Sequence, residues 1–304
     1  MSKVLSDVFV KKAKKELRED ESRKLQSYKI VKEWVLKHPF ITVLDPEILT
    51  LEMFLPFLRV KKFSMDKVYE SIEKTLLFIK RHKNWSDFHG EKLQRALDLY
   101  DTGYLIVTRE HDSECRKIIV CNHEMNLTKF NADDVFRLIV LLFSTLYNDE
   151  EAQIGGVIYI SDARAANINY ITSFTIKSFF QFVTQLKSSP IRMKKIVTVG
   201  MPAFANQLMN ISKLALSEKI KNRLKFVDGI SELSNQVDVS ILTEEYGGKY
   251  TKAELVEDFR PKLVANAKFM SEIIEKIQID FSKVVDKEYD ESEMRGSFRK
   301  LEID

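Results

Sequence analysis

Glycine, proline and cysteine are all scarce in this sequence. Only 9 glycines and 6 prolines occur among 304 residues, so few tight turns and no disordered linker are expected, and helices should dominate. The two cysteines, Cys115 and Cys121, cannot build a disulfide framework. Residues 1–20 contain no apolar segment of the kind that marks a secretory signal. We therefore expect a cytoplasmic protein.

Long apolar runs and catalytic signatures are missing as well. The longest apolar run, from Phe136 to Tyr147, is interrupted by polar residues and is too short to span a bilayer, so it predicts a buried helix. The sequence has no G-x-S-x-G, Walker A, G-x-G-x-x-G or H-E-x-x-H motif. Asp162 ends a predicted strand, where α/β enzymes place catalytic groups, but without an evident histidine partner we expect it to cap the next segment. The chain is therefore expected not to be an enzyme.

What the sequence does have is a large apolar content with many phenylalanines. Hydrophobic residues make up 44% and charged residues 31% of the chain, an ordinary composition for a globular protein, and 20 residues are phenylalanine. Because Phe has no polar tip, a chain rich in Phe can build a wide apolar interior. The length allows one large domain or two modest ones.

The apolar periodicity changes from helical to α/β along the chain. Residues 1–90 predict helices, one ending near His38 before a proline, one capped by Ser64, and one starting near Pro56. From about residue 100, β-type runs alternate with helical segments, which predicts an α/β layer fold with parallel strands. The expected strands are 104–108, 117–121, 156–160, 192–199 and 224–227, with a hairpin joining the first two; the expected helices are 131–148, 170–187, the segment after 202 and one near 262–281.

Four soft or borderline metal ligands lie close together in the predicted hairpin. His111, Cys115, Cys121 and His123 fall within 13 residues, and the last two, being two apart, face the same side of a strand. Four such ligands suit zinc, but neither C-x-x-C nor H-x3-H spacing is present. An ordinary hairpin with a buried cysteine is the favoured interpretation, and no metal or cofactor is expected.

Positive charge is concentrated in one segment. From Lys187 to Lys225 there are nine basic residues and one acidic residue, in a chain whose net charge is only +3. Arg192 and Lys194 share one face of a predicted strand, and Lys219 and Arg223 share one face of a predicted helix. Convergent Arg and Lys side chains suit a phosphate-bearing headgroup. Nucleic acid is not expected as a partner, because aromatic residues do not interleave with the basic ones and the net charge is low. A solvated helix face is the plainer alternative.

Several segments, in this order, resemble the CRAL-TRIO family. They are Phe54–Phe63, similar to the family's "FLRARKF" helix; Gly156–Asp162, similar to its central strand; 190–197 with Met201–Phe204, similar to the strand and start of its gate helix; Leu216–Leu224, similar to "fL-x-x-K-I-K-x-R-I"; and Leu242–Gly248, similar to "LP-x-E-Y-G-G". The sequence departs from the family pattern near Ala165, at Gly200 and at Thr243.

The resemblance implies a fold and a function. It implies an α/β lipid-binding domain at residues 91–250, with a mainly parallel sheet as floor and a mobile gate helix, between an all-helical region at 1–90 and a charged, partly helical extension at 251–304. One buried lipid, an isoprenoid or a phospholipid, would be the cargo. The family further implies that Arg192, Lys194, Lys219 and Arg223 bind phosphoinositide headgroups. We expect a monomeric, cytoplasmic carrier that associates transiently with anionic membranes.

The residues expected to face the lipid are apolar side chains of the predicted floor, walls and gate. For each of them, ordinary core packing is the alternative. A lipid-sensing scaffold without net transfer is the main alternative function, and an enzyme acting on a lipid is the second. The expected lipid-facing residues are Phe136, Val140, Tyr159, Ile160, Phe174, Phe179, Phe182, Val183, Phe204, Leu208 and Ile211.

Overall fold

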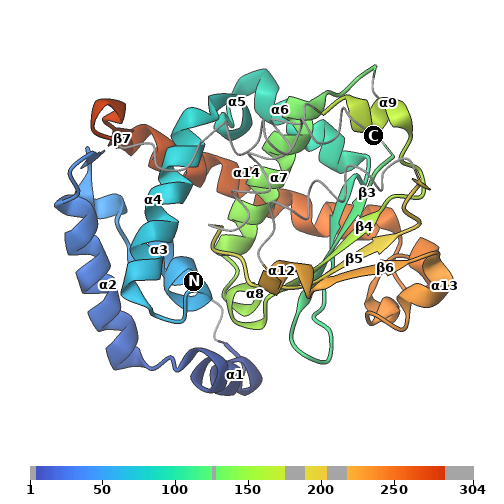
Figure 1. Cartoon of the computed structure of the whole chain (residues 1–304), viewed down its shortest axis with the longest axis horizontal. Coiled ribbons are helices and arrows are strands. Elements are labelled where there is room, and N and C mark those ends of the chain that lie inside the picture. Colours follow the sequence, from blue (N-terminus) through green and yellow to red (C-terminus); the bar gives the residue numbers. More distant parts are fainter. Residues whose placement is uncertain (1–4, 125–127, 175–188, 204–217, 285–304) are drawn as a thin grey trace, which may run out of the picture.

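A five-stranded sheet forms the centre of the structure. The computed structural model describes residues 5–124, 128–174, 189–203 and 218–284. Within them the sheet order is β2-β3-β4-β5-β6 (Figure 1). β2 pairs antiparallel with β3, which confirms the expected hairpin, and β3 to β6 are parallel, which confirms the α/β class. The strands are β2 (Leu105–Val107), β3 (Lys117–Asn122), β4 (Val157–Asp162), β5 (Met193–Val199) and β6 (Leu224–Val227).

Helices make up most of the part of the chain that precedes the five-stranded sheet, which also holds one short strand. α2 ends at Leu36, close to the stop expected near His38, and α4 begins directly after Ser64. The expectation for Pro56 was wrong: Thr50 caps α3, so Pro56 lies inside that helix instead of near its start. The helices are α1 (Asp7–Leu17), α2 (Glu21–Leu36), α3 (Leu51–Val60), α4 (Met65–Arg81), α5 (Lys83–Ser86) and α6 (Gly90–Asp101), with a 3-10 turn η1 (Pro46–Ile48).

α7 (Ala132–Tyr147) is the buried helix that the apolar run predicted. It begins with a capping box, in which the side chain of Asn131 accepts from the backbone N–H of Asp134, and the Asp134 side chain accepts from the backbone N–H of Asn131. α8 (Glu150–Gly155) follows and leads into β4. No helix among the described residues is long and apolar enough to cross a membrane.

The C-terminal part of the described chain is built into the rest of the molecule. α14 (Lys252–Lys276) starts ten residues earlier than expected, because Thr251 and Glu254 form a capping box and Pro261 lies within the helix without ending it. α14 packs against α6, α7 and β2, and Figure 1 shows it reaching across the molecule to β7 (Ile277–Ile279). β7 pairs with β1 (Ile41–Val43), so the chain after residue 250 contacts both earlier parts. The division at residues 90 and 250 stays a prediction.

The two faces of the sheet carry different residues. Side chains alternate along a strand, so Val157 and Tyr159 of β4 point to one face, while Ile158 and Ile160 point to the other. α6, α7, α14 and Tyr170 of α9 (Ile168–Thr172) pack on the first, which we call the upper face. The second face is covered by α13 (Ile230–Leu233), by the 3-10 turns η3 (Val239–Ile241) and η4 (Glu244–Tyr246), and by Leu255. α12 (Glu218–Lys221) precedes β6, and η5 (Phe281–Lys283) follows β7.

Candidate functional site

Four of the expected lipid-facing residues gather above the upper face. The ring of Phe136 lies 5.6 Å from that of Phe174, in an edge-to-face arrangement. Val140 packs with the same apolar cluster, and Tyr159 belongs to the sheet surface beneath. These residues come from α7, β4 and the segment after α9. They form an apolar wall and floor on one side of the sheet.

Ile160 does not belong to this group. It is fully buried on the opposite face of the sheet, in the core beneath β4 and β5. Tyr159 and Ile160 were both expected to face the lipid, but the side chains of consecutive strand residues point to opposite faces of a sheet. Ile160 is therefore a core residue. Six more expected residues lie outside the described part of the chain: Phe179, Phe182, Val183, Phe204, Leu208 and Ile211.

A chain of polar groups crosses the upper face beside the apolar wall. The hydroxyl of Tyr104 lies 2.5 Å from that of Tyr170, whose oxygen is 2.7 Å from Nδ1 of His123. Nε2 of the same imidazole lies 2.7 Å from Oγ of Ser161. Both ring nitrogens of His123 thus have a partner. Tyr170 also packs its ring 5.2 Å from Phe174, so the polar chain and the apolar wall adjoin.

The Ser161–His123 pair resembles a nucleophile and its base in distance alone. In a hydrolytic triad, a carboxylate orients the histidine and stabilises its charged form. Here the second ring nitrogen contacts the phenol of Tyr170, and the carboxylate of Asp162 is bound instead by Arg164 and Tyr246. Burial lowers the pKa of His123 to about 4, which makes it a weak base at neutral pH. Ser161 and His123 are therefore better suited to hydrogen-bond a polar group of a ligand than to abstract a proton.

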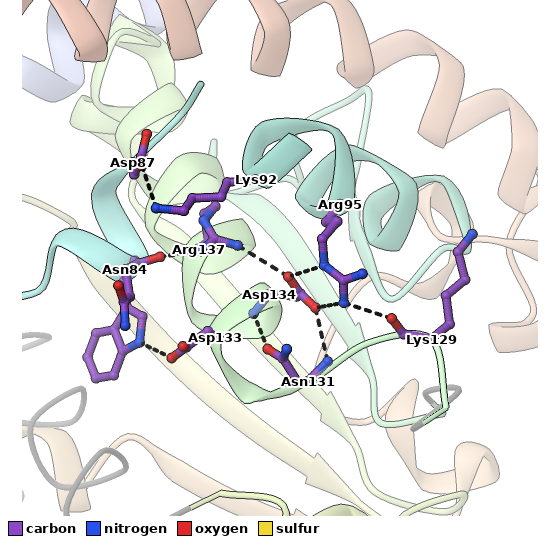
Figure 2. A network of polar contacts seen from close by, with 10 residues as sticks. Asn84, Asp87, Lys92, Arg95, Lys129, Asn131, Asp133, Asp134 and Arg137 are labelled. Carbon is purple, nitrogen blue, oxygen red and sulfur yellow. Dashed lines mark hydrogen bonds and ion pairs between the residues drawn. The ribbon is translucent and has the colours of Figure 1, made fainter. Parts of the chain in front are cut away.

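A buried ion cluster fixes the start of α7 (Figure 2). The carboxylate of Asp134 accepts from Nε and Nη2 of Arg95, at 3.0 and 2.6 Å, and from Nη1 of Arg137 at 3.2 Å. The Trp85 indole donates to Asp133 at 2.8 Å, which ties α5 to the same helix end. The cluster therefore positions the α7 turn that carries Phe136 over the sheet.

The four basic residues expected to act together do converge. Arg223 Nη1 donates to the carbonyl of Met193, the first residue of β5, which lies between Arg192 and Lys194. Burial, followed by the positive charge of Arg192, lowers the pKa of Arg223. Partial desolvation and then the charges of Arg223, Lys62 and Arg192, among others, lower the pKa of Lys219. Among the described residues, no acidic side chain pairs with Lys219 or Arg223. We call Arg192, Lys194, Lys219 and Arg223 the basic cluster.

Residues from the N-terminal helices also lie at the basic cluster, and periodicity in the sequence did not indicate them. Lys61, Lys62 and Lys67 all interact electrostatically with Lys219, although more than 150 residues separate them in the sequence. Lys62 and Phe63 have positive φ angles of 52° and 60°, which turn the chain sharply after α3. This turn buries Phe63 and leaves Lys62 exposed. The only sequence signal was the Lys-Lys pair within the FLRVKKF segment.

The cluster also contains an acidic residue from α1. Oε2 of Glu16 lies 2.6 Å from Nη2 of Arg192 and 2.9 Å from Nζ of Lys194, and Oε1 lies 2.8 Å from Nζ of Lys12. Burial alone would raise the pKa of Glu16, but these hydrogen bonds lower it far below its ordinary value. Nothing in the sequence indicated that α1 would reach β5.

The four soft ligands of the hairpin do not meet. His111 lies against Phe9 and Glu151, whereas Cys121 and His123 lie on the upper face with a sulfur–nitrogen distance of 3.9 Å. Burial raises the pKa of the Cys121 thiol to about 12, so it stays protonated at neutral pH. In the part of the chain that the structure describes, no group of three or more metal-ligating side chains occurs.

Comparisons with known proteins agree with this architecture. Residues 101–248 match the CRAL/TRIO domain. The human alpha-tocopherol transfer protein-like protein is 27% identical over 254 residues, which cover 80% of this chain and 71% of that protein. Clavesin-1 of Xenopus laevis is 26% identical over 255 residues, covering 80% and 74%. The crystal structure of Sfh5 aligns with 84% of this chain and 99% of that one, at a TM-score of 0.46 and 11% identity. Residues 101–248 therefore form a CRAL/TRIO domain.

Proposed function

We propose that this protein is a carrier that shields one hydrophobic lipid above the upper face of its sheet and exchanges it at membranes that contain phosphoinositides. The observation that carries the proposal is the coexistence of two surfaces on one CRAL/TRIO domain: an apolar wall beside the sheet and a basic cluster at the β5–β6 edge. The name of the human relative, a transfer protein-like protein, supports transfer as the activity. No cofactor takes part.

The apolar wall supplies the affinity for the lipid in this proposal. Burying an apolar lipid gains about 25 cal/mol for each Å² removed from water. In this proposal Phe136, Val140, Tyr159 and Phe174, which pack in the apolar clusters above the sheet, would face the lipid. The polar chain through His123 and Ser161 would accommodate a single hydroxyl or carbonyl at one end of the cargo. The expected gate-side residues Phe204, Leu208 and Ile211 remain part of the proposal.

The basic cluster supplies the membrane contact. Lys219 and Arg223, without acidic partners among the described side chains, would gain energy at an anionic surface, where each nearby Lys or Arg contributes about 1 kcal/mol. Lys61 and Lys62 extend the same surface from the helical region. Contact at this edge would favour release of the lipid if the open state gains more membrane contacts than the closed state.

Transfer between vesicles tests the proposal. Changing both Arg192 and Arg223 to Ala should slow delivery of a fluorescent isoprenoid to vesicles that contain phosphatidylinositol bisphosphate. Cargo binding in solution should be unchanged, because neither arginine lies on the upper face. A matched control changes Arg109 and Arg260, which pair with Asp258 and Asp101 far from the cluster. Delivery that is equally fast in the cluster variant and the wild type would refute the role of the cluster.

The main alternative is a lipid-sensing scaffold, in which bound lipid changes the surface that a partner recognises but is not delivered. The same fold would serve it, and the transfer assay separates the two functions. A protein that binds lipid and membranes, yet moves no lipid between vesicles, would favour the scaffold over the carrier.

A further inference from the structure

The carboxylate of Glu16 is surrounded by three cations at the edge of the basic cluster. Lys12 contacts one of its oxygens at 2.8 Å, while Arg192 and Lys194 contact the other at 2.6 and 2.9 Å. Three donors of charge +1 converge on a group that carries a single negative charge and two oxygens. A phosphate monoester carries between about −1.5 and −2 at neutral pH and has three strong acceptor oxygens, so it matches these donors better.

α1 does not depend on Glu16 for its position. Phe9, Ala13 and Leu17 form its buried face, and the Phe9 ring packs edge-to-face on His111 at 5.1 Å. Glu16 lies beside that face, and its side chain is 28% exposed. The carboxylate can therefore turn toward solvent while the helix stays docked and Lys12 stays beside β5.

We propose that Lys12, Arg192 and Lys194 form a phosphate-monoester site in which Glu16 is an internal competitor, and that Lys12 becomes a phosphate ligand when Glu16 is displaced. The inference rests on the proposed function, because it concerns the same basic cluster. It adds α1 to the membrane-binding surface and gives that surface a built-in threshold. An anion binds only if its contacts with the three cations outweigh those of the carboxylate it replaces.

Two substitutions one helical turn apart test this assignment. Glu16→Gln and Lys12→Gln both break the same Lys12–Glu16 pair, so any loss of α1 docking would shift affinity in the same direction for both. If Glu16 is a competitor and Lys12 is a ligand, the two substitutions shift the affinity for the phosphate in opposite directions. Glu16→Gln should tighten binding about fivefold and Lys12→Gln weaken it by a similar factor, as expected for a partly exposed ion pair of ~1 kcal/mol.

The control is a second lysine–glutamate pair at the same spacing, at the C-terminal end of α2. Glu33 and Lys37 lie 2.5 Å apart, with side chains 65% and 74% exposed, and neither contacts the basic cluster. Glu33→Gln and Lys37→Gln change the net charge by the same amounts. They should alter binding less than about twofold, the residual effect of net charge alone.

Binding is measured with the full chain in two arms: phosphatidylcholine vesicles with phosphatidylinositol bisphosphate, and soluble inositol trisphosphate. Opposite shifts for the two α1 variants, beyond those of the α2 controls, support the assignment in whichever arm they appear, and that arm identifies a lipid headgroup or a free phosphate as the source. Shifts in the same direction, or shifts no larger than the controls, would overturn it. A wild-type protein that binds in neither arm would instead refute the proposed role of the whole basic cluster.

Discussion

Arg59 offers the sharpest test of how the helical region is attached to the CRAL/TRIO domain. Its side chain is 1% exposed. Nε and Nη2 donate to the two oxygens of Glu19 at 2.9 and 2.7 Å, Nη2 also donates to Glu150 at 3.0 Å, and Nη1 donates to Gln153 at 2.6 Å. One guanidinium thus joins the segment between α1 and α2, the end of α3, and α8. The same α3 end leads to Lys61 and Lys62 at the basic cluster.

Replacing Arg59 with Met should destabilise the protein by roughly 3–5 kcal/mol. Glu19, whose side chain is 8% exposed, would be left as a buried charge without its main partner, and breaking a buried pair costs about that much. The double variant Arg59→Met with Glu19→Gln should recover at least ~1 kcal/mol of this loss, because it removes the unpaired charge. Urea unfolding with a constant m-value measures both. A single variant that loses less than ~1 kcal/mol, or a double variant less stable than the single one, would show that Arg59 does not neutralise a buried charge.

Two further predictions concern the polar chain on the upper face. Because the pKa of His123 is about 4 in the folded protein and about 6.5 in an unfolded chain, the unfolded state takes up the proton first as the pH falls. The free energy of unfolding should therefore decrease by ~1–3 kcal/mol between pH 6.5 and pH 4 because of this residue. A His123→Asn variant should lack that part of the pH dependence. Equal pH profiles of the unfolding free energy for the variant and the wild type would contradict this prediction. Ser161 should remain unlabelled by a fluorophosphonate probe at neutral pH, since its neighbour is a weak base without a carboxylate partner, and stoichiometric labelling detected by mass spectrometry would revive the enzyme alternative.

The sequence predicted the elements of the sheet better than their environment. All five expected strands form, because each is a short β-branched or aromatic run bounded by polar residues. Arg192 and Arg223 converge for a different reason from the one expected: α12 ends at Lys221, so Arg223 does not share a helix face with Lys219 but lies in the turn before β6, which pairs with β5. Ile160 was misplaced because apolarity identifies a buried residue but does not say on which face of a sheet it is buried.

What could not be predicted are the contacts between segments distant in the sequence. Glu16 contacts Lys194 of β5, and Lys61 comes within electrostatic range of Lys219 on α12, only because the helical region docks on the domain through apolar side chains and through Arg59. Local periodicity contains no information about such docking. The polar chain through Tyr104, Tyr170 and His123 escaped notice for the same reason, since its members lie up to 66 residues apart and carry no shared motif.

The proposed function requires that this chain hold one hydrophobic lipid. Native mass spectrometry of the purified protein, followed by organic extraction and identification of the released molecule, tests it most directly. We expect a single apolar lipid, bound one to one, whose addition back to stripped protein restores the same mass. A protein that stays empty, and takes up neither isoprenoid nor phospholipid when offered them, would contradict the carrier function and leave the scaffold alternative.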